Sequence, residues 1–272
     1  MATSNLATRL ATAVIGVPLI LLLLYRGPAV AFYLLTLTAA LIGSWEFFGM
    51  THRDDIVARI VGLSFSTAAS ASVYFFGHEP SVLVATLAVI PLLGPVVTLF
   101  RLGDMSTAAL RACAMGFGPF FIAVPLALLA VMRRDLGDDG PSYVVLSIMF
   151  AWFADTGGYF AGRFLGKRKL YEAVSPKKTV EGAFGGLAGA AIGAALASFW
   201  YLKSIPIMHS IPLALLAATL GQAGDLGESL IKRSTGVKDS GAIVPGHGGI
   251  LDRVDALLLT TTVVYVYTLW HR

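Results

Sequence analysis

Nine long apolar runs constrain this sequence more than any other feature. They lie at residues 9–25, 28–50, 56–76, 81–100, 107–132, 141–162, 180–202, 207–230 and 251–270. Each is close to the roughly 20 residues that an α-helix needs to cross a bilayer. Backbone polar groups in lipid must pair within their own segment, which a helix achieves. The sequence therefore predicts an all-α, polytopic integral membrane protein with about nine transmembrane helices.

The composition excludes an ordinary soluble protein. Charged residues make up 13% of the chain, against about 25% in soluble domains. The net charge of +4 does not indicate a nucleic-acid partner, because in so apolar a chain the distribution of charge between loops is more informative. No linker is long enough to separate soluble domains. We predict a single membrane domain over 1–272, with an N-terminal helical part at 1–140 and a catalytic part at 141–272.

The first apolar run has a second interpretation, since one arginine followed by an apolar run is also typical of a signal peptide. Arg26 and Gly27 follow this run in place of a small-residue cleavage site. We therefore predict a retained first helix.

The basic residues are distributed unevenly between the two predicted membrane sides. The N-terminus and the even-numbered loops carry fifteen Lys and Arg residues, and the other side carries five. Because basic loops stay in the cytoplasm, the N-terminus and the even loops are predicted to be cytoplasmic, in a protein of the cell (inner) membrane. The two longest loops, 163–179 and 231–250, lie on this side.

Acidic residues inside membrane helices are costly and are therefore candidates for function. The sequence has seven: Glu46, Asp155, Glu181, Asp225, Glu228, Asp252 and Asp255. Asp225 and Asp252 lie on neighbouring helices, and a turn between those helices would bring them together. Oxygen ligands without a Cys or His cluster favour Mg²⁺, so we predict a magnesium site on these two residues. The alternative is structural pairing of the acids with Lys232, Arg233 or Arg253.

The loop 163–179 contributes a second group of bases. In the segment SPKKTVEG, we predict that Ser175, Pro176 and Thr179 form a turn that caps the next helix. The helix N-terminus, Lys177 and Lys178 would then point at one anion, which favours a phosphate contact. The alternative is a cationic collar that contacts anionic lipid heads, and we assign residues 167–169 to such a collar.

His247 lies in the glycine-rich segment PGHGG. It is either a structural hydrogen-bonding residue or part of a phosphate site, in which Gly248 and Gly249 let backbone N–H groups approach the phosphate. The sequence leaves both roles open.

The segment SLIKRSTGVKDSGAIVPGHGGILDRVD, which begins at Ser229, resembles the signature of phosphatidate cytidylyltransferases, the CDP-diacylglycerol synthases. The segments SPKKTVEG and WFADTGGYFAGRFLGK resemble two further segments of the same family. The first 140 or so residues agree with the family only in being hydrophobic and helical.

This resemblance implies transfer of CMP from CTP to phosphatidate, which releases pyrophosphate and leaves CDP-diacylglycerol in the membrane. It also implies Mg²⁺ on Asp225 and Asp252, a monovalent cation such as K⁺ beside it, and a homodimer. The expected catalytic residues are Asp225, Asp252, Lys232, Arg253 and Asp255. The expected substrate-binding residues are Lys177, Lys178, Arg233, Lys238, His247, Gly248, Gly249 and Ser229. Asp155 and Glu228 are expected to support the site, and Arg253 or Lys232 is the alternative contact for the lipid head group.

Two rival functions use similar parts. Intramembrane acids and small-residue helices also describe secondary transporters, but here the charges concentrate in the last third of the chain on one membrane face. A lipid or polyprenol kinase would need the same acids and bases, and the signature or the reaction products separate it from a cytidylyltransferase.

Overall fold

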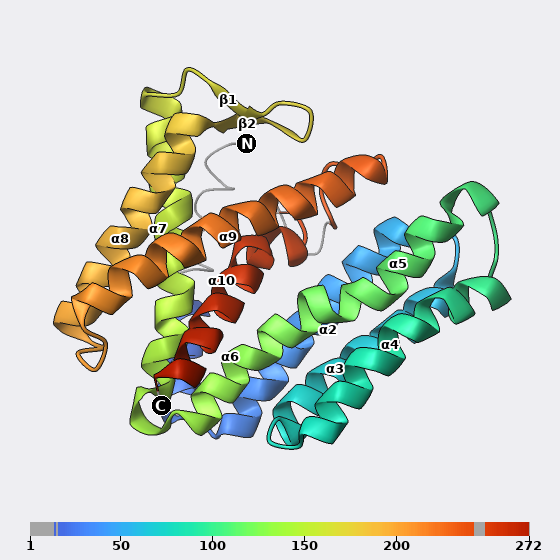
Figure 1. Cartoon of the computed structure of the whole chain (residues 1–272), viewed down its shortest axis with the longest axis horizontal. Coiled ribbons are helices and arrows are strands. Elements are labelled where there is room, and N and C mark those ends of the chain that lie inside the picture. The colour runs from blue at the N-terminus through green and yellow to red at the C-terminus, as the bar shows by residue number, and fades with distance from the viewer. Residues whose placement is uncertain (1–13, 15, 242–247, 272) are drawn as a thin grey trace.

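The structure, a computed structural model, describes residues 14, 16–241 and 248–271. It is built from α-helices, which Figure 1 shows as two groups: α2 to α6, and α7 to α10. The helices are α2 Ala29–Thr51, α3 Ile56–Phe76, α4 Pro80–Phe100, α5 Ala108–Gly118, α6 Val124–Asp135, α7 Gly140–Phe164, α8 Val180–Trp200, α9 Ile207–Ser234 and α10 Leu251–Trp270. Short helical turns lie at η1 Met105–Thr107, η2 Pro119–Ala123 and η3 Gly137–Asp139.

Seven helical segments among the described residues are long and apolar enough to span a membrane. They are Ala29–Thr51, Ile56–Phe76, Pro80–Phe100, Met105–Asp135, Gly137–Phe164, Val180–Trp200 and Ile207–Ser234. The predominantly α-helical fold is therefore confirmed, and these helices suit a membrane by their length and composition. The run 9–25 lies largely outside the described residues, and a shorter apolar helix occupies Gly16–Arg26. The run 251–270 forms α10, which is not among these seven segments. The count of nine crossings therefore stays a prediction.

The segment Met105–Asp135 stays continuous in spite of its prolines. Its middle is a π-helical turn at Pro119–Ala123, between α5 and α6. A proline ring clashes with the preceding helical turn and lacks an N–H donor, and a wider turn relieves both problems.

Helices α7 and α8 approach until their backbones touch. A Cβ atom on Gly157 would overlap the carbonyl group of Gly185, and one on Gly189 would overlap the carbonyl oxygen of Phe153. The small residues of α8 thus allow its close packing against α7.

A two-stranded hairpin precedes α8 and corrects one prediction. Strands β1 Lys169–Tyr171 and β2 Ser175–Thr179 pair antiparallel, with Lys169 opposite Thr179. Ser175 and Pro176 thus lie in a strand, and the predicted turn at these residues is wrong. Proline is compatible with the edge of so small a sheet because the edge leaves N–H groups unpaired. The predicted cap is confirmed, since the Thr179 hydroxyl accepts a hydrogen bond from the N–H of Gly182 at 3.0 Å.

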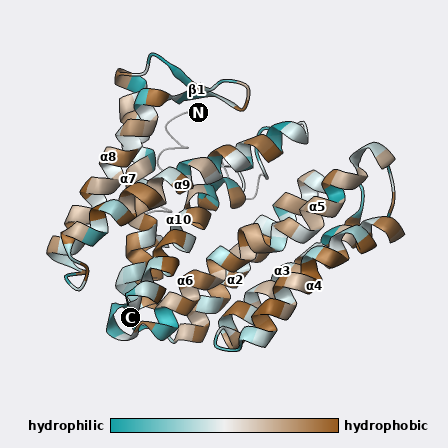
Figure 2. Cartoon of the chain, in the orientation of Figure 1, coloured by the Kyte–Doolittle hydropathy of each residue, from teal (hydrophilic) through white to brown (hydrophobic). Residues whose placement is uncertain are grey.

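Polar residues concentrate at the ends of the helices. In Figure 2 the hairpin is largely hydrophilic, whereas long stretches of the helices are hydrophobic. Large apolar side chains such as Leu92, Leu99 and Phe100 are exposed on α4. An apolar outer surface of this kind suits lipid.

The loop between α2 and α3 is tied to the end of α4. Arg101 donates to both carboxylate oxygens of Asp55, at 3.0 and 2.8 Å. This hydrogen-bonded pair lowers the pKa of Asp55 to about 2. His52 in the same loop is buried, and its burial lowers its pKa to about 4, with a further contribution from the charge of Arg111.

Candidate functional site

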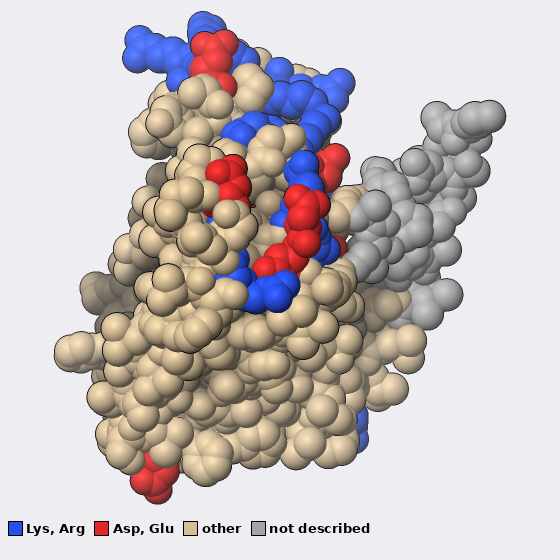
Figure 3. Space-filling view, turned by 90° about the vertical axis from the view of Figure 1, so that its right-hand side faces the viewer, with Lys and Arg blue, Asp and Glu red and all other residues tan. Residues whose placement is uncertain are grey.

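A cavity of about 470 Å³ opens among α7, α8, α9, α10 and the hairpin. Its charged lining residues are Asp155, Arg163, Lys177, Lys178, Asp225, Asp252 and Asp255. Figure 3 shows Lys and Arg side chains gathered at this end of the molecule with Asp and Glu among them, above a large uncharged surface. The cavity therefore combines acids and bases at one end of the apolar bundle.

One face of α7 supplies a wall of the cavity. Asp155, Tyr159 and Arg163 follow each other at intervals of four residues, so they share one helical face. The Arg163 guanidinium donates to the Tyr159 hydroxyl at 2.7 Å. Sequence reasoning missed Tyr159 and Arg163 as site residues, although this helical spacing from Asp155 was a signal that could have found them.

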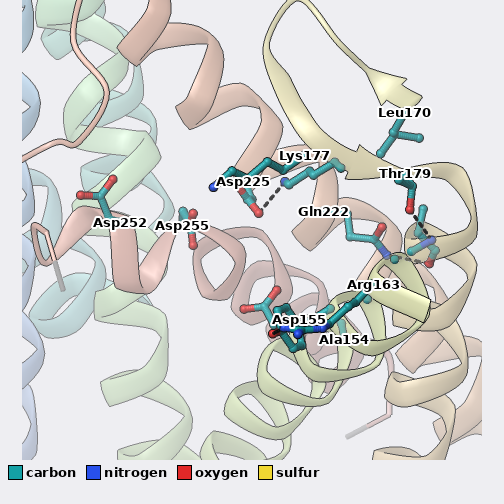
Figure 4. Close-up of a pocket in the computed structure, with 16 residues that line it drawn as sticks. Ala154, Asp155, Arg163, Leu170, Lys177, Thr179, Gln222, Asp225, Asp252 and Asp255 are labelled. Atoms are coloured by element: carbon teal, nitrogen blue, oxygen red, sulfur yellow. Dashed lines mark hydrogen bonds and ion pairs between the residues drawn. The ribbon is translucent and has the colours of Figure 1, made fainter. Parts of the chain in front are cut away.

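The hairpin places a lysine against an acid of α9 and a second lysine at the cavity wall. The Lys178 ammonium lies 2.5 Å from the Asp225 carboxylate, and Lys177 beside it also lines the cavity (Figure 4). Thr179, which follows in β2, caps α8 and thereby fixes the end of the strand. The two predicted chemical segments, around Lys178 and around Asp225, thus meet in one place.

Three acids from three helices face the same cavity. Asp155 of α7, Asp225 of α9 and Asp255 of α10 lie near enough for their charges to repel one another. Lys178 and Arg253 offset part of this repulsion at Asp155. We call Asp155, Asp225 and Asp255 the acid wall. Within the described residues, no group of three or more His, Cys, Asp or Glu side chains lies close enough together to hold a metal ion.

Asp252 is held differently, by protein donors on both oxygens. Its Oδ1 lies 2.6 Å from the Lys232 ammonium, which also contacts the buried Glu228 at 2.5 Å. Its Oδ2 accepts from the backbone and hydroxyl of Ser240, at 3.0 and 2.9 Å, and from the Gly249 N–H at 2.9 Å. We call Glu228, Lys232 and Asp252 the buried clamp. For Asp252, the pairing with Lys232 that the sequence left open is therefore present.

The remaining signature residues lie around this clamp. Arg233 is exposed and donates to the Val237 carbonyl at 3.0 Å. Lys238 is exposed as well, whereas Ser229 is buried. Among the described residues, these three do not line the cavity of the acid wall. Arg253 is exposed, and its charge acts on Asp155.

The geometry at positions 248 and 249 requires glycine, independently of the predicted phosphate contact. Gly248 has a φ of +79°, and a Cβ atom there would lie 2.8 Å from Asp252 Oδ2. A Cβ atom on Gly249 would overlap the Ser240 hydroxyl and the carboxylate of Glu46. Their predicted phosphate contact stays a prediction, and His247 lies outside the described residues.

Comparison with known proteins identifies the family of this chain. The model of a family described as the cytidylyltransferase family matches residues 7–271. The chain is similar to the phosphatidate cytidylyltransferase of Brucella suis biovar 1 (strain 1330), with 33% identity over 97% of this chain and 93% of that protein. It is also similar to the phosphatidate cytidylyltransferase of Bacillus subtilis (strain 168), with 43% identity over 48% of this chain and 49% of that protein. The latter match spans about half the length of the relative.

Proposed function

This chain belongs to the cytidylyltransferase family, and from that premise we propose that it transfers CMP from CTP to phosphatidate, producing CDP-diacylglycerol and pyrophosphate. The relatives' names support this choice of substrates. One structural observation carries the proposal: the acid wall and the bases Lys177, Lys178 and Arg163 line one cavity at the end of an apolar helix bundle. A lipid head group and a nucleotide triphosphate need such a place to meet.

The chemistry is a displacement at the α-phosphorus of CTP. An oxygen of the lipid phosphate forms a bond to this phosphorus while the bond to the bridging oxygen breaks, and pyrophosphate leaves with the electron pair. The lipid phosphate is already an anion, so no base has to activate it. Positioning two polyanions and neutralising their charge therefore contribute most of the catalysis.

The bases of the hairpin and of α7 are suited to the phosphates. Lys177 and Arg163 would bind phosphate oxygens at the cavity wall, and Lys178 would exchange its contact with Asp225 for one with the substrate. Arg233 and Lys238 lie farther along the signature segment and would meet the nucleotide at the rim. Arg253 or Lys232 would hold the phosphatidate head group.

The acid wall fits a divalent cation by its chemistry. Carboxylate oxygens are ligands that Mg²⁺ prefers, and repulsion among Asp155, Asp225 and Asp255 would be relieved by a cation. We propose Asp225 as a ligand, with Asp255 and Asp155 on the same wall. Asp252 is the second candidate ligand, and it would have to exchange a protein donor for the cation. Mg²⁺ would supply charge neutralisation at the reacting phosphates.

The remaining expectations are part of the same proposal. The basic loops support a cytoplasmic position for the N-terminus and the cavity, in the inner membrane. A monovalent cation such as K⁺ and a homodimer are proposed on the family resemblance alone.

The test uses CTP labelled separately in its α- and γ-phosphates. Purified protein is incubated with phosphatidate and Mg²⁺, with and without EDTA, and the lipid phase is counted. We expect label from the α-phosphate only, and none with EDTA. Label from the γ-phosphate would indicate a kinase, and no label from either would favour the transporter.

A further inference from the structure

Glu46 is a buried acid that the proposed chemistry does not use. It lies on α2 in the N-terminal half, and only 4% of its surface is exposed. Its Oε1 accepts the N–H of Ile250 at 3.0 Å, and its Oε2 accepts the N–H of Leu251 at 2.8 Å. The Ser240 hydroxyl lies 3.2 Å from Oε2. A side chain of α2 thus holds the start of α10, about two hundred residues away in sequence.

The contact suits the electrostatics of a helix N-terminus. The first N–H groups of a helix have no partner within the helix, and the helix dipole favours a negative charge beside them. Burying a carboxylate is costly unless its oxygens accept hydrogen bonds, and here both do. Glu46 therefore caps α10 from another helix.

The glycines of the signature segment leave room for this carboxylate. A Cβ atom on Gly241 would lie 2.6 Å from Glu46 Oε1, and one on Gly249 would overlap Oε2. The backbone on both sides of the turn therefore packs directly against Glu46. These two glycines have a packing reason that involves the acid of α2.

Ser240 connects Glu46 to the buried clamp. Its hydroxyl is within hydrogen-bonding distance of both Glu46 Oε2 and Asp252 Oδ2, at 3.2 and 2.9 Å. The other oxygen of Asp252 holds Lys232. A change at Glu46 would therefore reach Asp252 through Ser240 and through the first turn of α10, which Asp255 follows.

We propose that Glu46 is a positioning residue for the reaction: it fixes the turn around Ser240 and the N-terminus of α10, and so sets the places of Asp252 and Asp255. The inference rests on the proposed cytidylyl transfer. Because a misplacement of about 1 Å at a reacting centre can cost about 100-fold in rate, the effect is expected in kcat. The KM values for both substrates should change less, since Glu46 is buried and does not line the cavity of the acid wall.

Glu46→Gln is the main variant, because it keeps the size of the side chain and replaces one acceptor oxygen with an amide donor. That donor would face the N–H of Ile250 or Leu251. We expect kcat per folded molecule to fall about 10- to 100-fold. Glu46→Asp, which keeps the charge with a shorter reach, should recover part of the loss. The matched control is Ser44→Ala, a buried change on the same helix that should leave kcat within about twofold of wild type.

A double-mutant cycle with Ser240→Ala separates positioning from general stability. If Glu46 acts through Ser240, the combined variant should lose less activity than the product of the two single losses. A Glu46→Gln enzyme with wild-type kcat, or losses that multiply fully, would overturn the inference. If Glu46→Gln does not fold, Glu46→Asp and Ser240→Ala carry the test, and wild-type kcat in both would overturn it. Failure of the proposed function is distinct, because the wild-type enzyme itself would then label no lipid.

Discussion

The acid wall and the buried clamp lie side by side where α9 packs against α10, yet their acids have different surroundings. In the clamp, Lys232 lies between Glu228 and Asp252, and backbone donors complete the shell around Asp252. In the wall, three carboxylates repel one another beside a cavity. The acids of the clamp share buried protein donors and stabilise the scaffold. The acids of the wall have Lys178 on Asp225 as an exchangeable partner, and they are suited to a cation that arrives with the substrate.

The largest effect should come from Asp225→Asn in the wall. We expect activity to fall about 100- to 1000-fold, because the variant removes the carboxylate that is proposed to hold a cation at the reacting phosphates. The protein should still fold, since the substitution relieves repulsion with Asp155 and Asp255 and the amide oxygen remains an acceptor for Lys178. The lipid-labelling assay and size-exclusion chromatography measure the two quantities. Asp138→Asn, an exposed change in η3, is the control, and equal activity in both variants would contradict the assignment.

Asp252→Asn and Asp255→Asn should differ in their effect on the stability of the protein, because Asp252 lies in the clamp and Asp255 in the wall. Asp252→Asn weakens charged hydrogen bonds inside the clamp and should destabilise the protein by about 2 kcal/mol. Asp255→Asn removes a repelling charge and should leave the melting temperature unchanged or raised. Thermal unfolding in detergent measures both. A lower melting temperature for Asp255→Asn than for Asp252→Asn would break the distinction.

Lys177→Ala should weaken CTP binding more than it slows the reaction. We expect the KM for CTP to rise about 10-fold, which corresponds to the loss of about 1.4 kcal/mol of binding free energy. Steady-state kinetics with CTP as the varied substrate measure this change. Lys167→Ala, an exposed residue outside the cavity lining, is the matched control. Equal KM values in the two variants would assign Lys177 to a lipid-facing collar.

The smallest effect concerns His52, a buried residue in the loop between α2 and α3. Its pKa is about 4 in the folded protein and 6.5 in the unfolded chain, so the unfolded state binds more protons between these values. Its contribution to stability is therefore complete above pH 6.5 and is lost as the pH falls towards 4. We expect wild type to lose about 1 to 2 kcal/mol between pH 7 and pH 5 at this residue.

His52→Gln should remove this part of the pH dependence. His78→Gln, at an exposed histidine, serves as the control and should leave it intact. Melting temperatures measured across the pH range compare the three proteins. The same slope in His52→Gln and wild type would contradict the role of His52.

Sequence reasoning succeeded where the signal was local. Apolar runs gave the spanning helices, and the signature segments gave the end of the bundle where Asp225 and Lys178 meet. The hairpin at 169–179 was missed because so short a polar segment has no clear hydrophobic period. Helical spacing also could not decide whether Lys232 pairs with Asp225 or with Asp252, since that depends on how α10 packs on α9.

The contact of Glu46 with Leu251 is a second contact that the sequence could not predict. The sequence marked Glu46 as a costly acid within a helix, but its partners lie about two hundred residues away. Only the packing of α2 against α10 brings them together. An intramembrane acid is thus a sound signal of importance, while its role has to come from its contacts.

The most direct test of the division between wall and clamp is cation binding without turnover. Mn²⁺ can replace Mg²⁺ as a spectroscopic probe, and electron paramagnetic resonance measures the free ion in the presence of purified protein. Wild type, Asp225→Asn and Ser240→Ala are compared at equal protein concentration. We predict that Asp225→Asn loses tight Mn²⁺ binding and that Ser240→Ala, which removes a hydroxyl beside Asp252 and Glu46 but no acid of the wall, keeps it. Wild-type binding by Asp225→Asn would contradict a cation site on the acid wall.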